Sequence, residues 1–175
     1  MSGALSPREL ARCGVLGAAA LLLPVLFHLV RLGHVFMPMY LPLVTLAFLV
    51  RPLPAATTAL LVPLLSAVVT GMPPLYPPVA VVMAVELAVM GALIAAVVGR
   101  WPEANPWLLL AAALALGRVL HVAAVYGIAR VLDLPAAFLA GVSLLAGWPG
   151  ILLMLAVVPP TVLTLRRGAP GPGGG

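Results

Sequence analysis

Charged side chains are scarce in this chain: they make up 7% of its 175 residues, whereas 64% are hydrophobic and the mean hydropathy is +1.24. A soluble domain usually carries about 25% charged residues, because polar groups must cover its surface. This scarcity excludes an ordinary cytosolic enzyme, a nucleic-acid-binding domain and a disordered chain. It predicts an all-α integral membrane bundle, embedded in a lipid bilayer and without a soluble domain.

Cysteine and acidic residues are also rare. The single cysteine, Cys13, excludes an internal disulfide and a multi-cysteine metal site. The four acids are Glu9, Glu86, Glu103 and Asp133, and no two are neighbours in sequence, so none forms a magnesium-binding carboxylate pair. The short motifs of metalloproteases, serine hydrolases and P-loop or dinucleotide-binding proteins are absent. We therefore expect no enzymatic activity, no cofactor and no metal, and an ATP-driven role would require a partner that hydrolyses ATP.

Lysine is absent altogether, and the net charge of +5 comes from nine arginines spread along the chain. A nucleic-acid-binding protein would gather such residues on one face, so we expect no nucleic acid as a partner. In a membrane protein, the distribution of arginine between the loops instead indicates which side of the membrane each loop occupies.

Six apolar segments are candidates for membrane-spanning helices, because each approaches the about 20 residues that cross a bilayer. They are residues 13–32, 35–50, 55–72, 79–99, 107–132 and 148–165. The second is short and contains Pro38 and Pro42. This pattern predicts a cytoplasmic segment over 1–12, a six-helix substrate-binding domain over 13–165 and a disordered cytoplasmic tail over 166–175. The longer connection 133–147 is still apolar and compatible with a short helix at the outer surface.

The arginines predict which side the ends occupy. An even number of spans puts both termini on one side, and six arginines then fall on that side, against two on the other and one within a span. The six are Arg8, Arg12, Arg51, Arg100, Arg166 and Arg167. Because arginine is enriched in cytoplasmic loops, both termini are predicted to be cytoplasmic in a multi-pass protein of the cell membrane.

Glu86 and Arg118 are the charged residues predicted to lie inside the membrane. Each costs a few kcal/mol in hydrocarbon, so both should face the bundle interior or a wet cavity. Met83, Glu86 and Met90 recur on one helical face, and His121 and Tyr126 follow Arg118 within a broad face of the next span. Two compatible interpretations stay open: a structural Glu86–Arg118 ion pair, or a substrate pocket that these residues line.

Four aromatic residues, Tyr40, Tyr76, Tyr126 and Trp148, lie toward the outer half of the predicted bundle. A tyrosine or tryptophan offers a flat apolar face and one polar atom, which suits a small-molecule pocket, although each one alone could also be an interfacial anchor. The candidate substrate-binding residues are therefore Glu86, Arg118, His121, Tyr126, Met83, Tyr76, Tyr40 and Trp148.

Small residues begin the first span. Gly14 and Ala18 are spaced as small-x-x-x-small, which allows another helix to approach closely. Such a pair is common in alanine-rich sequences, so a contact inside the bundle and a partner-binding face are both open.

Several motifs over residues 14–165 together resemble the S-components of energy-coupling factor (ECF) transporters. They are His34-Val-Phe-Met-Pro-Met-Tyr-Leu-Pro42, Pro63-Leu-Leu-Ser66, Thr70-Gly-Met-Pro-Pro-Leu-Tyr-Pro-Pro78, Met83-Ala-Val-Glu-Leu87 and Gly147-Trp-Pro-Gly-Ile151. The resemblance implies a six-helix subunit that captures a vitamin or related micronutrient from outside. Its partners would be a transmembrane scaffold subunit and two ATPase subunits, and Gly14 and Ala18 would contact the scaffold. An ion-coupled carrier or a membrane-embedded enzyme, each using Glu86, are the alternatives.

Overall fold

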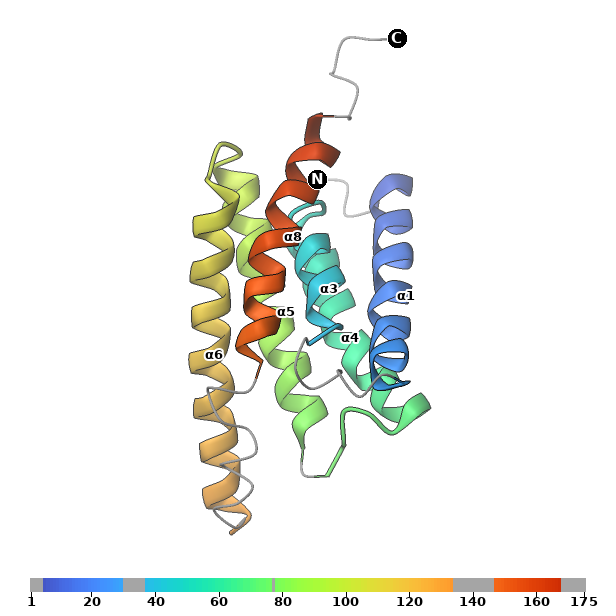
Figure 1. Cartoon of the computed structure of the whole chain (residues 1–175), viewed down its shortest axis with the longest axis vertical. Helices are drawn as coiled ribbons and strands as arrows, with labels where there is room; N and C mark the ends of the chain where they lie inside the picture. The colour runs from blue at the N-terminus through green and yellow to red at the C-terminus, as the bar shows by residue number, and fades with distance from the viewer. Residues whose placement is uncertain (1–4, 30–36, 77, 134–146, 168–175) are drawn as a thin grey trace.

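The computed structural model describes residues 5–29, 37–76, 78–133 and 147–167, which fold into six helices (Figure 1). They are α1 (Pro7–Leu29), α3 (Tyr40–Ala47), α4 (Pro52–Thr70), α5 (Val79–Arg100), α6 (Pro106–Val131) and α8 (Trp148–Arg167). The prediction of an all-α fold is confirmed. The predicted helix within 133–147 and most of the predicted tail lie outside the described residues.

Five of these helices are long and apolar enough to cross a membrane, namely α1, α4, α5, α6 and α8. Their length and composition suit a multi-pass membrane protein. The helices α4, α5, α6 and α8 follow the predicted third to sixth spans to within a few residues. Apolar run length was sufficient to locate them, because each run is flanked by proline, glycine or arginine.

The second predicted span, by contrast, is not confirmed. The helix in this segment, α3, has only eight residues, which at 1.5 Å per residue covers about 12 Å of a hydrocarbon core of about 30 Å. Before the helix, Met37 has a left-handed φ of 46° and its carbonyl accepts a turn hydrogen bond from Tyr40 N at 3.0 Å. After it, the N–H groups of Phe48 and Leu49 bond to carbonyls three residues back, which closes the helix. The prolines within this run therefore coincide with a shortened helix rather than a full span.

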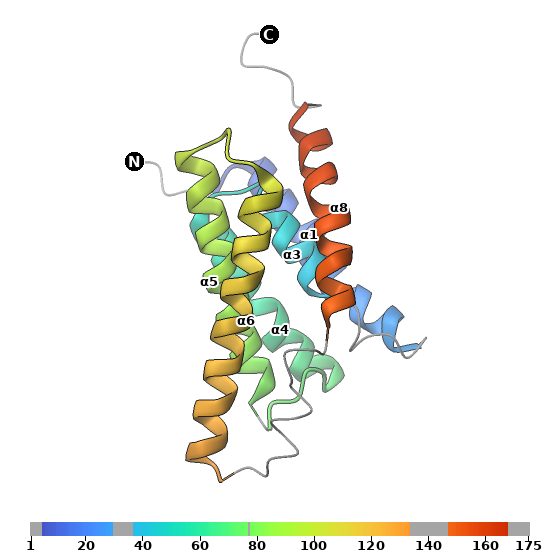
Figure 2. The same ribbon diagram turned by 60° about the vertical axis from the view of Figure 1, so that its left-hand side comes forward.

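Short as it is, α3 lies at the centre of the bundle. Every one of its residues except Leu41 is buried. It contacts α1, α4, α5 and α8, and Figures 1 and 2 show it enclosed among the longer helices. A helix too short to span a bilayer is tolerated within a membrane bundle where protein surrounds it, and the neighbouring helices surround α3.

Successive helices run in opposite directions, so α1 begins and α8 ends at the same end of the bundle (Figures 1 and 2). At this end Arg12 Nη1 donates to the carbonyl of Leu49 at 2.6 Å, and Arg166 Nη1 donates to the carbonyl of Pro102 at 3.3 Å. We call it the arginine end; it comprises the start of α1, the α3–α4 turn, the α5–α6 turn and the end of α8. In the described part of the chain, the start of α1 and the end of α8 thus lie at the same end of the bundle.

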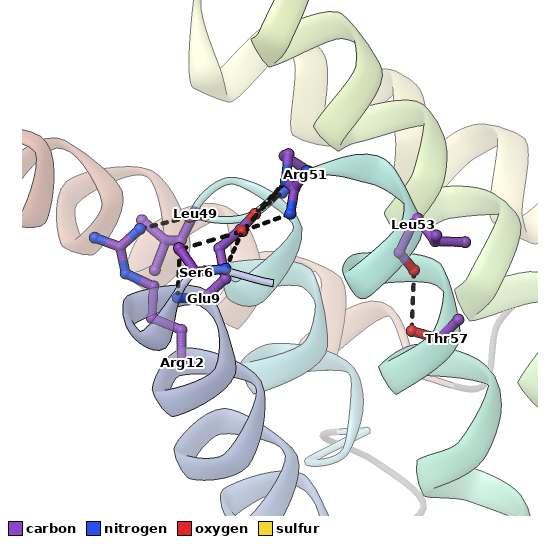
Figure 3. Close-up of polar contacts among 7 residues, drawn as sticks. All are labelled: Ser6, Glu9, Arg12, Leu49, Arg51, Leu53 and Thr57. Carbon is purple, nitrogen blue, oxygen red and sulfur yellow. Dashed lines mark hydrogen bonds and ion pairs between the residues drawn. The ribbon is translucent and has the colours of Figure 1, made fainter. Parts of the chain in front are cut away.

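The first helix begins at Pro7, six residues earlier than the predicted span. Ser6 and Glu9 form a capping box: Glu9 N donates to Ser6 Oγ at 3.2 Å, and Ser6 N donates to Glu9 Oε2 at 3.2 Å. Glu9 also accepts from Arg51 Nε at 2.9 Å, which ties the start of α1 to the start of α4 (Figure 3). This carboxylate raises the pKa of the Arg51 guanidinium above its ordinary value. Residues 7–12 are therefore part of α1, and the prediction of a cytoplasmic segment over 1–12 stays a prediction.

Candidate functional site

Glu86 lies on α5 with its side chain directed into the bundle. The residue is only 5% exposed, so its carboxylate requires hydrogen-bond partners to offset the loss of hydration. The predicted face is confirmed in its main part, because Glu86 and Met90 are buried and Met83 is partly buried against the core. The cost of a charge in hydrocarbon, together with the helical periodicity, had predicted an inward-facing Glu86.

Tyr40 and His121 supply the partners of Glu86. The Tyr40 hydroxyl donates to Glu86 Oε2 at 2.8 Å, and His121 Nδ1 lies 2.7 Å from the same oxygen. Tyr40 is 7% exposed and His121 is 8% exposed, so all three polar groups are withdrawn from solvent. The Tyr40–Glu86–His121 cluster joins α3, α5 and α6 at one carboxylate oxygen. In a low dielectric such charge-assisted bonds are strong, and they fix the orientation of each ring.

Gly117 makes this approach of α6 to α5 possible. It lies one helical turn before His121, and a Cβ atom at this position would collide with Met90 Sδ and lie 3.0 Å from Glu86 Oε1. Gly117 was not among the residues predicted to form the site. The available signal was a glycine in the middle of a long helix, where it lowers stability by about 0.5–1 kcal/mol relative to alanine and therefore needs a packing reason.

Arg118 lies on α6, close to Gly147 at the start of α8. Its Nη2 donates to Met37 Sδ at 3.7 Å, and a Cβ atom on Gly147 would lie 2.7 Å from the same nitrogen. Gly147 has a left-handed φ of +90°, which glycine adopts without strain. Because Tyr40 and His121 already satisfy Glu86, the carboxylate does not depend on Arg118 as a partner. Pairing of Arg118 with a ligand stays a prediction.

Three of the predicted aromatic residues lie on the exposed surface instead of in the cluster. Tyr76 is 75% exposed, Trp148 57% and Tyr126 48%. The Tyr126 hydroxyl accepts from Arg130 Nε at 3.0 Å, and its ring faces the same guanidinium at 5.1 Å. The expectation that His121 and Tyr126 share one face is therefore wrong, because five residues rotate a helix by about 140°.

The predicted partner-binding residues face outward from α1. Gly14 and Ala18 are both exposed, and a Cβ atom at Gly14 would meet nothing within 4 Å. The small residue that packs inside the bundle is Gly17, whose Cβ would contact Thr58 at 3.4 Å and Val62 at 3.7 Å. Of the two open interpretations, the described structure leaves Gly14 and Ala18 available for a partner.

A shallow depression with about 10 Å³ of free space, no more than one water molecule needs, lies between α5 and α6, lined by Pro78, Val79, Val82, Val125 and Ile128. None of the predicted site residues lines it, and its walls are apolar. Within the described ranges, no three His, Cys, Asp or Glu side chains gather as a metal site would require. The polar side chains that were predicted inside the bundle gather instead in the Tyr40–Glu86–His121 cluster.

No family model, curated protein or solved structure matches this chain.

Replacing Gly117 by alanine should destabilise the bundle, because the added methyl group would collide with Met90 and press on Glu86. Overpacking of this kind typically costs about 1–3 kcal/mol. The matched control is Gly127→Ala on the same helix, where a Cβ atom meets nothing within 4 Å and should be neutral or stabilising. Thermal unfolding in detergent measures both variants. Equal unfolding temperatures for the two would contradict the close approach, whereas partial rescue of Gly117→Ala by Met90→Ala would support it.

Proposed function

We propose that this chain is the substrate-capture subunit of an ECF-type importer, which binds a vitamin or related micronutrient from outside. A transmembrane scaffold and two ATPase subunits would supply the energy. The observation that carries the proposal is the buried Tyr40–Glu86–His121 cluster. A membrane bundle retains such expensive polar groups chiefly where they serve function.

The cluster lies on the side of the bundle opposite the arginine end. Glu86 lies in the first half of α5 and His121 in the second half of α6, which are the halves remote from that end. Tyr40 is the first residue of α3, so it too lies away from the arginine end. If that end is cytoplasmic, as the arginine distribution predicts, the cluster belongs to the outer half of the bundle.

The groups around the cluster suit a small organic ligand. Met37 and Met83 are partly buried and pack against the core, where methionine adapts its shape to flat molecules. Arg118, beside Met37, could pair with an anionic group of the ligand. The cluster would then orient the ligand or the side chains that contact it, rather than carry out a reaction.

The 2.7 Å contact between Glu86 and His121 also favours a second candidate, an ion-coupled carrier. Carboxylate and histidine pairs serve as proton relays in membrane pumps and transporters. Such a carrier would move its substrate in reconstituted vesicles under a proton gradient, without partner proteins or ATP. The importer subunit would bind substrate but not transport it alone.

The purified chain should bind one member of a vitamin panel at micromolar concentration or below. Glu86→Gln should weaken binding about tenfold, because it removes the charge that holds Tyr40 and His121 in place. Glu103→Gln, an exposed acid at the arginine end, is the control and should leave affinity unchanged. Equilibrium binding in detergent provides the measurement. A folded protein that binds no member of the panel would rule out the proposal.

The outward face of α1 should hold the scaffold subunit. Gly14→Leu and Ala18→Leu should reduce co-purification with the scaffold while leaving ligand affinity near that of wild type, because both positions are exposed. Gly17→Leu provides the contrast: it should lower the stability of the isolated chain, since Thr58 and Val62 fill that space. If Gly14→Leu and Ala18→Leu both co-purify as wild type does, the assignment of this face is wrong.

A further inference from the structure

Two arginines from different helices converge on the carboxyl end of α3. Arg12, on α1, donates to the carbonyl of Leu49 at 2.6 Å, and Arg166, on α8, donates to the carbonyl of Phe48 at 3.5 Å. These carbonyls belong to consecutive residues just past α3, where the helix leaves acceptors without intrahelical partners. The two guanidinium groups therefore bracket a single turn of backbone.

Positive charge is in excess around this turn. Arg8 is exposed one helical turn before Arg12, and Arg100 is exposed at the end of α5. The described acids at this end are Glu9, which binds Arg51, and Glu103. The arginines outnumber the acids, so the field at this end attracts anions.

We propose that the arginine end binds the phosphate group of an anionic phospholipid between Arg12 and Arg166. A guanidinium offers five N–H donors, arranged in a planar fork that matches the geometry of a phosphate. Arg12 uses one donor and Arg166 two in their bonds to backbone carbonyls, so both side chains keep donors for a ligand. In the described ranges α1 and α8 do not contact each other but pack against α3 from its two sides. A lipid headgroup can therefore reach the turn between them from the bilayer.

The surroundings of the two arginines favour a lipid over a soluble phosphate. The helix ends that carry the two arginines also expose apolar side chains, with Leu10 61% and Leu165 49% exposed, and acyl chains can lie against these. At the same end, the Arg100 guanidinium lies over the Trp101 ring, 5.6 Å from the ring centroid. Tryptophan is enriched at the headgroup level of membranes, which places this end of the bundle among headgroups. A phospholipid satisfies the charge and the apolar surface together.

Native mass spectrometry of the full chain in neutral detergent tests the proposal, using equal amounts of phosphatidylglycerol and phosphatidylcholine with identical acyl chains. Wild type should retain phosphatidylglycerol in preference. Arg8→Gln, Arg12→Gln and Arg166→Gln should each reduce that preference about fivefold, the factor expected for one arginine at an anionic surface. Arg130→Gln is the control, since Arg130 lies at the opposite end against Tyr126.

Arg8→Gln keeps the test decisive if the other two variants unfold, because Arg8 is exposed and does not cap α3. Equal retention of the two lipids by wild type would overturn the proposal, as would an equal loss in Arg130→Gln and Arg8→Gln. Displacement of phosphatidylglycerol by glycerol phosphate at a matched concentration would also overturn it, because the site would then recognise a soluble phosphate. Binding of an acidic partner protein at this end, with no lipid preference, would assign the arginines to a protein interface instead.

Discussion

A helix of eight residues cannot cross a membrane, and the architecture of this protein depends on how the bundle accommodates one. Neighbouring helices hold α3 near both ends: the hydroxyl of Tyr40, its first residue, donates to Glu86, while Arg12 and Arg166 donate to the carbonyls just past its last residue. The longer helices bury its sides. One short element thereby brings the intramembrane carboxylate and the arginine end into a single connected structure.

Much of this fold could be predicted from composition. Long apolar runs located α4, α5, α6 and α8, because lipid exposure demands apolar side chains over a fixed length. The same criterion failed for α3, since a buried short helix and a lipid-exposed span are equally apolar. The start of α1 was predicted six residues too late. The pattern Ser6-x-x-Glu9 was the signal that would have located it.

The candidate site was predictable only in part. Periodicity and the rarity of charge identified Glu86 and His121, and Tyr40 was proposed as an outer-half aromatic residue. Their contacts were not predictable, because Tyr40 is 46 residues and His121 35 residues away from Glu86 in sequence. A helical face does not reveal which neighbour it meets. Gly117 went unnoticed because a glycine in an alanine-rich helix resembles ordinary filler, and only the packed structure shows that Met90 and Glu86 occupy its space.

The most direct test of this account is a double-mutant cycle between Tyr40 and Glu86, measured by unfolding in detergent with Tyr40→Phe, Glu86→Leu and the combined variant. The account predicts a coupling free energy of about 1 kcal/mol, above the ~0.6 kcal/mol average for hydrogen bonds between membrane helices, because this acceptor is a carboxylate. Single-variant costs that add to within about 0.3 kcal/mol would show two independent sites. The claim that α3 is anchored through Glu86 would then be contradicted.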